Sequence, residues 1–304
     1  MKVPQPIPYQ GSKRGIARFI LRFFPRDIRT LIEPFAGSAA VSLAAACRGR
    51  ASRFHLNDIN EPLMALWQEV ISDPERISHG YEELWDQQKG REREFYDGVR
   101  DVFNRTRRTD CFLYLLARCV KASVRYNSRG EFNQSPDNRR KGRHPMRMRD
   151  DILAASRLLR GRTAISSKDY KEVLWSVSEA DLVYMDPPYQ GVCGGRDPRY
   201  YTGISVEEFV DELRELVTRK ISFILSYDGR RGQQTYGRGL PAKSGLYRIE
   251  VRAGRSAQST LLGRSDVTYE SIYLSQGLLE RLGLSPDKLV REWGTQEATQ
   301  LVLP

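Results

Sequence analysis

Four consecutive residues, Asp186-Pro187-Pro188-Tyr189, hold the most specific chemistry in the 304-residue sequence. They follow an apolar run at 181–185 with the composition of a buried strand. Two prolines remove two backbone donors and stiffen the chain where it leaves the sheet. The Asp186 carboxylate and the Pro187 carbonyl then remain as acceptors, with the Tyr189 ring beside them. This set suits an exocyclic amino group on a planar base; the alternative is a proline-rich loop at a strand end.

A second candidate site lies near the N-terminus, where an apolar run at 30–35 is followed by Gly37. A glycine in that turn lets a ligand approach the bare backbone. The next predicted strand, 53–57, stops at Asp58, about 20 residues later, where an acidic side chain suits two ribose hydroxyls. No second glycine follows Gly37, so the ligand is expected to contain adenosine without a pyrophosphate. The alternative is an ordinary strand–turn–helix unit with a capping aspartate.

The elements that position these residues alternate between strands and helices in two separate blocks, which is typical of a parallel sheet. Between the blocks, apolar spacing predicts several helices. The segment 125–144 has no apolar periodicity and is predicted to be a loop. Trp67, Trp85 and Trp175 are expected in the core. The predicted strands are 30–35, 53–57, 181–185 and 221–226, with late strands at 246–251 and 271–275 that we expect to be antiparallel at the sheet edge. The predicted helices are 11–24, 38–47, one from Glu61 onward, 74–85, 92–103, 110–124, 148–159 and 206–217.

Charge gives a first indication of the partner. The chain has 49 Lys and Arg against 38 Asp and Glu, a formal net charge of +11, and the excess is concentrated at 121–160. A clustered basic segment favours a polyanionic partner, because each neutralised phosphate releases counterions; a solvated charged surface is the alternative. No apolar run is long enough to span a membrane, and four cysteines without a CxxC pair favour a reduced, cytoplasmic protein without zinc.

Four segments together resemble the Dam-type (D12 class, alpha-group) DNA adenine-N6 methyltransferases. These segments are PYQGSKRGI at 8–16, IEPFAGSAAVSL at 32–43 with NDIN at 57–60, RYNSRGEFNQSP at 125–136, and LVYMDPPY at 182–189. Weaker similarity extends over most of 8–275. The resemblance implies an α/β, class I S-adenosylmethionine-dependent methyltransferase (Rossmann-like) sheet domain with an inserted helical DNA-recognition domain. The implied catalytic domain is 1–72 and 163–276, the recognition insert is 73–162 with a basic hairpin loop at 125–146, and the C-terminal tail is 277–304.

The resemblance also implies roles for individual residues. The implied catalytic residues are Asp186, Pro187 and Tyr189, with Tyr189 stacking on the target base. The implied cofactor-binding residues are Tyr9, Lys13, Glu33, Phe35, Gly37, Asp58 and Asp186. The implied DNA-binding residues are Arg125, Tyr126, Asn127, Arg129, Asn133, Arg139, Arg140 and Lys141. For Tyr126, packing inside the insert is the alternative to a contact with DNA. Two positions depart from the family pattern: Ala39 replaces a usual glycine, and Tyr9 stands where tryptophan is common.

The expected activity is therefore methyl transfer from S-adenosylmethionine to N6 of an adenine flipped out of a short duplex DNA sequence, without a metal ion. We expect a monomer that binds double-stranded DNA, and a cognate restriction endonuclease that acts separately is a further candidate partner. The alternatives are an RNA adenine-N6 methyltransferase and a catalytically inactive DNA-binding module of the same fold. Cytosine-N4 transfer also suits this type of acceptor site.

Overall fold

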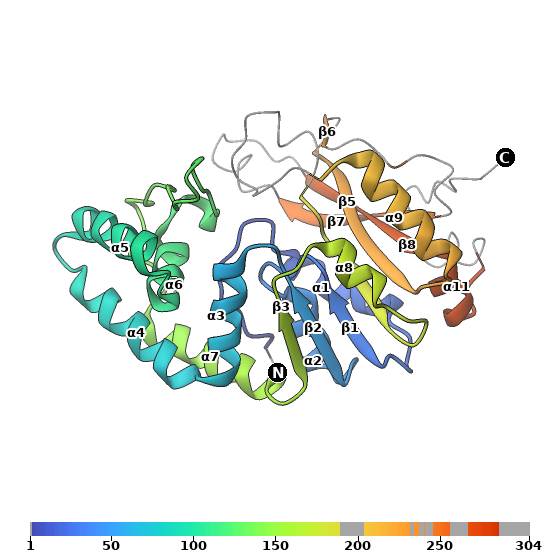
Figure 1. Cartoon of the computed structure of the whole chain (residues 1–304), viewed down its shortest axis with the longest axis horizontal. Helices are drawn as coiled ribbons and strands as arrows, with labels where there is room; N and C mark the ends of the chain where they lie inside the picture. The colour runs from blue at the N-terminus through green and yellow to red at the C-terminus, as the bar shows by residue number, and fades with distance from the viewer. Residues whose placement is uncertain are drawn as a thin grey trace.

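A computed structural model of the chain describes residues 2–188, 204–231, 234–236, 240, 246–255 and 267–285. Figure 1 shows a twisted sheet with helices on both of its faces, and a lobe made only of helices at one side of it. This architecture confirms the predicted α/β fold class. Tyr189 and residues 190–203 lie outside the described residues, so the predicted role of Tyr189 stays a prediction.

The sheet has the strand order β3-β2-β1-β4-β5-β8-β7, with β6 paired to β5. The first five strands in that order are parallel, and β8 is antiparallel to both β5 and β7, as expected for the late strands. The chain order reverses between β1 and β4, and ligands of such sheets bind at that point, beyond the carboxyl ends of the strands. The strands are β1 (Thr30–Glu33), β2 (Arg53–Asn57), β3 (Thr163–Ser166), β4 (Leu182–Met185), β5 (Phe223–Arg231), β6 (Gln234–Tyr236), β7 (Leu246–Arg255) and β8 (Val267–Ser275).

Apolar stripes on the helices bury both faces of the sheet. In α9 (Val206–Thr218), the buried side chains Phe209, Val210, Leu213 and Leu216 follow helical spacing and pack against the sheet. The helix α8 (Tyr170–Trp175) covers the same face, and α1 (Ala17–Ile20) and α2 (Ala40–Cys47) belong to the core on the opposite face. After β8, α11 (Gln276–Leu282) packs against β8 and β5.

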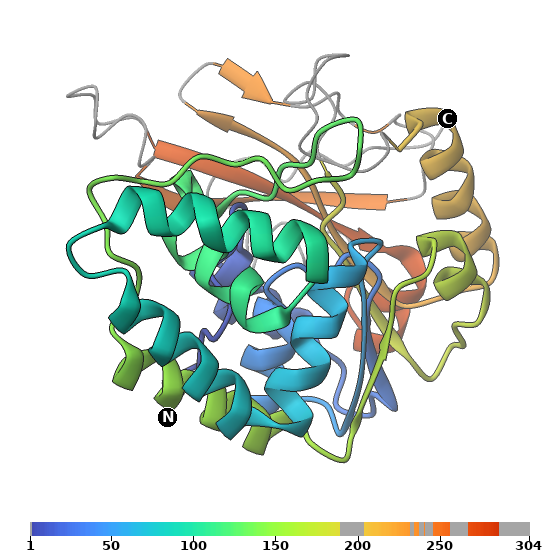
Figure 2. The ribbon, with the colours of Figure 1, turned by 60° about the vertical axis from the view of Figure 1, so that its left-hand side comes forward.

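The helical lobe shares its core with the sheet rather than standing apart from it. Its last helix, α7, packs against α2 of the sheet layer as well as against α3 and α4, and one apolar cluster runs through both parts (Figure 2). The predicted boundaries of the insert remain a prediction. The helices are α3 (Glu61–Ser72), α4 (Pro74–Gln87), α5 (Glu92–Thr106), α6 (Thr109–Arg118), the 3-10 turn η3 (Val120–Ala122) and α7 (Pro145–Leu159).

Three predicted helices differ from those observed. The segment 11–24 is not one helix but a 3-10 turn η1 (Lys13–Gly15), then α1, then a 3-10 turn η2 (Leu21–Phe23). The helix predicted at 110–124 ends at Arg118, because Cys119 is extended with ψ 161°, and Lys121 and Ala122 then adopt positive φ angles of 59° and 51°. The helix α7 begins at Pro145 instead of residue 148, since proline lacks the N–H that a first helical residue leaves unpaired anyway. Sequence patterns also missed β3 and α8.

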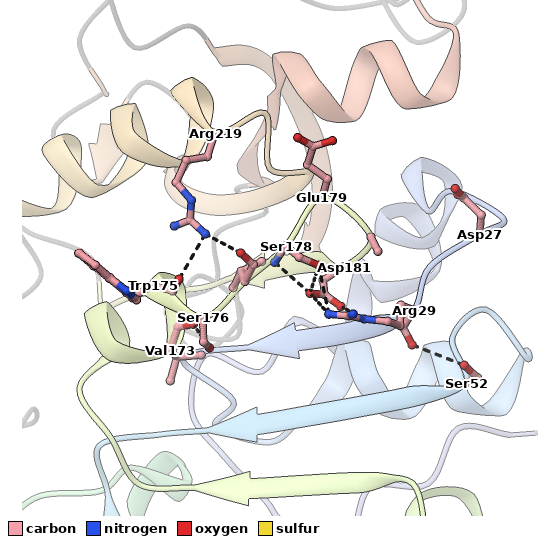
Figure 3. A network of polar contacts seen from close by, with 12 residues as sticks. Asp27, Arg29, Ser52, Val173, Trp175, Ser176, Ser178, Glu179, Asp181 and Arg219 are labelled. Carbon is pink, nitrogen blue, oxygen red and sulfur yellow. Dashed lines mark hydrogen bonds and ion pairs between the residues drawn. The ribbon is translucent and has the colours of Figure 1, made fainter.

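At the amino end of β4, arginine side chains fix the loop that enters the strand (Figure 3). Arg219 donates hydrogen bonds to the carbonyls of Leu174, Trp175 and Val177, and Arg29 pairs with Asp181 at 3.0 Å. The prediction that Trp175 is a core residue is wrong: its side chain is 85% exposed at this edge. No helix among the described residues is long and apolar enough to cross a membrane.

Candidate active site

A cavity of about 440 Å³ opens at the carboxyl ends of β1, β2 and β4, where the strand order reverses. Residues predicted from the sequence and residues that were not predicted share its wall. The predicted residues in the wall are Tyr9, Lys13, Glu33, Phe35, Gly37, Asp58, Tyr126, Asp186 and Pro187. The cavity therefore joins the cofactor-site candidates to the acceptor pair after β4.

The turn after β1 is held in one conformation by contacts around Gly37. Its φ of +47° is a value that residues with a side chain rarely adopt, and a Cβ added there would lie 3.2 Å from the ring of Tyr9. The Gly37 N–H donates to Asp58 Oδ2 at 3.0 Å, and Trp67 Nε1 donates to the Gly37 carbonyl at 2.9 Å. The absence of a side chain at Gly37 thus lets the Tyr9 ring pack closely against the turn in the cavity wall. Ala39, the residue in place of a usual glycine, is also left-handed, with φ 46°.

Asp58 lies where the second strand ends, directly opposite that turn. Its Oδ2 accepts from Gly37 and its Oδ1 accepts from the Asn60 N–H at 3.0 Å. Burial raises the pKa of Asp58, while these two N–H donors oppose the rise. Because each carboxylate oxygen has a second acceptor direction, Asp58 retains the capacity to bind hydroxyl groups of a ligand.

Glu33 is a buried carboxyl group under the same turn. It accepts a hydrogen bond from the Ser42 N–H at 2.7 Å in the first turns of α2. Burial, together with the negative charge of Asp186, raises its pKa to about 7, although the bond from Ser42 works in the other direction. Glu33 therefore changes charge near neutral pH, next to the cavity.

Asp186 forms an ion pair with Lys13. The distance from Lys13 Nζ to Asp186 Oδ1 is 2.8 Å, and Lys13 Nζ also lies 3.9 Å from Glu270 Oε2 on β8. Burial alone would lower the pKa of Lys13, but the two carboxylates raise it overall. The lysine predicted as a cofactor ligand thus contacts the predicted catalytic carboxylate.

Sequence reasoning missed one wall of the cavity, which consists of Lys168, Asp169 and Tyr170 after β3. The buried Asn57 side chain attaches this segment to β1: its Nδ2 donates to the carbonyls of Pro34 and Lys168, and its Oδ1 accepts from the Lys168 N–H. The polar run SSKD at 166–169 could have indicated this wall, as a polar segment at the end of a strand. The strand itself, however, has only four residues and little apolar character, so it was not predicted.

An apolar face and an excess of negative charge complete the cavity. Phe35 packs against Tyr170 with ring centroids 5.2 Å apart, and Ile59 lines the cavity although 52% of its surface is exposed. Carboxylates outnumber lysines in the wall, which favours a cationic ligand. The carboxylates are those of Glu33, Asp58, Asp169, Asp186 and Glu208, and the lysines are Lys13, Lys168 and Lys171.

The segment predicted as a recognition hairpin is a hairpin, with an isolated antiparallel bridge between Tyr126 and Phe132. Its tip depends on Asn127, whose Oδ1 accepts from the N–H groups of Arg129 and Glu131 and whose Nδ2 donates to Glu131 Oε2. Arg129 is 78% exposed and pairs with Glu131 at 2.8 Å. Asn127 therefore stabilises the tip, and Arg129 projects from it.

Tyr126 is buried at the base of the hairpin and lines the cavity, so it packs within the protein while its predicted contact with DNA stays a prediction. Its side chain is 6% exposed, its ring meets Phe132 edge to face, and its hydroxyl donates to Asn60 Oδ1 at 3.1 Å. Burial of this amphipathic ring joins the hairpin to the sheet domain.

Side chains of the lobe bind the backbone of the basic loop at several points. Asn104 binds both the N–H and the carbonyl of Phe132, at 2.8 and 3.0 Å. Tyr96, Gln88 and Tyr81 donate to the carbonyls of residues 134, 141 and 143. The loop is therefore positioned as firmly as a regular element.

Three cations in the second half of the loop lie at the surface, each beside a carboxylate. Arg139 and Arg140 are about 70% exposed and both pair with Asp137, and Lys141 pairs with Glu92 at 3.0 Å. Such exposed pairs contribute little to stability, so these cations can exchange carboxylate for phosphate at small cost. Arg125 is partly buried at the base of the hairpin, and Asn133, at the other side of that base, is exposed.

The sheet is doubly wound, with its cavity at the β1/β4 switch point. A glycine turn faces an acidic residue after β2, and an acceptor pair follows β4. Together these features define a class I methyltransferase fold. The chain belongs to the D12 class N6 adenine-specific DNA methyltransferase family, whose sequence model matches residues 9–254.

Curated relatives have related names. The chain is 28% identical over 60% of its length to a DNA N-6-adenine-methyltransferase of Escherichia phage P1, 23% of which is covered. It is 30% identical over 62% of its length to the type II methyltransferase M.MjaIII of Methanocaldococcus jannaschii, and the match covers 70% of that protein. It is 27% identical over 60% of its length to a DNA adenine methylase of Escherichia coli K12, and the match covers 64% of that protein. The chain thus spans less than two thirds of the phage and Escherichia coli proteins.

Proposed function

We propose that this protein transfers a methyl group from S-adenosylmethionine to N6 of adenine in duplex DNA. The observation that supports this most strongly is the placement of Asp186 and Pro187 in the wall of a cavity that also contains the Gly37 turn and Asp58. The names of the relatives and the family are consistent with it. A monomer would suffice, because one chain holds both the cavity and the basic hairpin.

The cavity fits the cofactor that the family implies. Asp58 would accept hydrogen bonds from the ribose hydroxyls, and Ile59 and Phe35 would pack against the faces of the adenine ring. Carboxylates around the cavity would favour a cation over the uncharged thioether product. Bound S-adenosylmethionine would supply an electrophilic methyl group on its sulfonium sulfur.

The chain's own contribution to the chemistry would be to prepare the amine. The lone pair of an adenine amino group is delocalised into the ring, which makes it a poor nucleophile. Acceptors at Asp186 and at the Pro187 carbonyl would bind its two protons and favour a pyramidal nitrogen. Fixed acceptors beside a developing positive charge contribute about 3 kcal/mol or more, and orientation for in-line attack adds to this.

The adenine must leave the duplex to reach these acceptors, since the cavity lies at the sheet and not on an exposed ridge. We propose that Tyr189 stacks on the extruded base. The hairpin at 125–133 and the cations Arg139, Arg140 and Lys141 would bind the duplex, the hairpin tip in a groove and the cations at phosphates. Both belong to the helical lobe at the side of the sheet (Figures 1 and 2), and Tyr126 of the hairpin lines the cavity.

The test is methylation in vitro of bacterial DNA that lacks N6-methyladenine, with isotope-labelled S-adenosylmethionine and mass spectrometry of the released nucleosides. We expect labelled N6-methyladenine in duplex DNA and none in structured RNA of the same concentration. Label in N4-methylcytosine, label only in RNA, or no label at all would each refute the proposal.

A further inference from the structure

Lys13 occupies an unusual place for a charged side chain. It is 8% exposed, begins the turn η1, and reaches across the cavity edge to a carboxylate that is 173 positions later in the sequence. A buried ammonium group is costly unless it is paired and hydrogen-bonded. Here Asp186 supplies the pair at 2.8 Å, and the Gly11 carbonyl accepts a further hydrogen bond at 3.3 Å.

We infer that Lys13 is a positioning residue for Asp186, holding its carboxylate ionised and oriented, rather than primarily a ligand of the cofactor. This inference rests on the proposed methyl transfer. Lys13 binds Oδ1 at 2.8 Å, and this contact restrains the orientation of the carboxylate toward the adenine amine.

The groups around Asp186 explain why a cation is needed there. Glu33 on β1 and Glu270 on β8 are carboxyl groups, Tyr184 on β4 is a buried phenol, and each interacts electrostatically with Asp186 or with its lysine partner. Like charges in a poorly solvated site favour uptake of a proton. A protonated Asp186 would present an O–H donor to the amine and lose its value as an acceptor. The charge of Lys13 opposes that protonation.

The position of Lys13 also links Asp186 to the cofactor side of the cavity. Residues 9–13 line the cavity, Tyr9 covers Gly37, and Ser12 accepts a hydrogen bond from Ser38 at 2.7 Å. One short segment thus touches both the turn after β1 and the acceptor after β4. An occupied cofactor site would therefore keep Lys13 in place beside Asp186.

The experiment compares the unchanged protein with Lys13→Met, Lys13→Arg and Arg14→Met. Methionine keeps the length of the lysine without its charge, and Arg14→Met removes an exposed charge at the neighbouring position of the same turn. Two quantities are measured: the single-turnover methylation rate of duplex DNA against pH at saturating S-adenosylmethionine, and the cofactor dissociation constant. A third measurement, independent of activity, is ¹³C NMR titration of the aspartate carboxyl carbons without cofactor or DNA, with Asp186→Asn to assign the signal.

We expect Lys13→Met to lower the single-turnover rate by about 100-fold and to move the acidic limb of its pH profile and the Asp186 titration midpoint to higher pH. The cofactor dissociation constant should change by less than about threefold, Lys13→Arg should recover most of the rate, and Arg14→Met should resemble the unchanged protein. An unaltered Asp186 titration, or weaker cofactor binding with a normal saturated rate, would overturn the inference. If the unchanged protein methylates nothing, the proposed function fails, and the NMR titration still decides whether Lys13 keeps Asp186 ionised.

Discussion

Replacing Gly37 by alanine tests how the turn after β1 forms the cofactor site. A left-handed backbone costs a residue with a Cβ about 1–2 kcal/mol, and the new Cβ would also lie 3.2 Å and 3.3 Å from two ring carbons of Tyr9. The chain offers a matched control in Gly49, which has φ +61° and nothing within 4 Å of an added Cβ. Gly49→Ala therefore has the backbone cost alone, and Gly37→Ala has the same cost plus crowding at the cavity.

We expect Gly49→Ala to lower the melting temperature by roughly 2–4 °C, in keeping with a loss of about 1–2 kcal/mol in a chain of this length, and Gly37→Ala to lower it further because of the crowding against Tyr9. Only Gly37→Ala should weaken S-adenosylmethionine binding, by about tenfold, because the strained turn spends less time in the conformation that donates to Asp58. Thermal unfolding and isothermal titration calorimetry measure the two effects. Equal cofactor affinity in Gly37→Ala and the unchanged protein would refute this account of the turn.

Three further predictions follow from other contacts. Burial raises the pKa of Glu33 to about 7, so this carboxyl group becomes negative as the pH rises through neutrality. Binding of the cationic cofactor, measured by calorimetry, should therefore tighten by up to about tenfold from pH 6 to pH 8, and Glu33→Gln should remove this pH dependence. Asn104→Leu should release the hairpin at Phe132 and relax the methylated sequence, measured by sequencing with modified-base detection, while cofactor affinity stays constant; an unchanged motif would contradict this. Arg139→Ala should weaken DNA binding equally for all sequences and reduce its salt dependence by about one ion, whereas a sequence-dependent loss would point to a base contact.

Much of the site could be predicted because its residues sit at the ends of strong sequence patterns. Apolar runs in the sequence predict buried strands. Asp58 and Asp186 follow such runs, so both could be placed at the carboxyl ends of strands from the sequence alone. The ion pair between Lys13 and Asp186 could not be predicted, since a lysine in a glycine-containing loop gives no sign of which distant carboxylate it meets.

The features that sequence patterns missed depend on tertiary contacts. The strand β3 has four residues of mixed exposure, and it is held beside β2 by parallel backbone pairing with residues 54–57, with the Asn57 side chain binding the segment that follows it. Tyr126 sits in a polar, arginine-rich segment, so its burial depends on the partners Asn60 and Phe132 from elsewhere. Trp175 was predicted to be buried but is exposed, because nothing in the sequence distinguishes a large apolar residue at the end of a short surface helix from one in the core.

We propose that Asp186 acts on the adenine amine and not on the cofactor. The most direct test measures, on the same preparations of the unchanged protein and of Asp186→Ala, the single-turnover rate of adenine methylation and the dissociation constant of S-adenosylmethionine. We predict that the variant loses methylation by more than about 1000-fold while cofactor affinity stays within about threefold. A variant that methylates at a near-normal rate, or one that loses activity only because it no longer binds S-adenosylmethionine, would contradict the account.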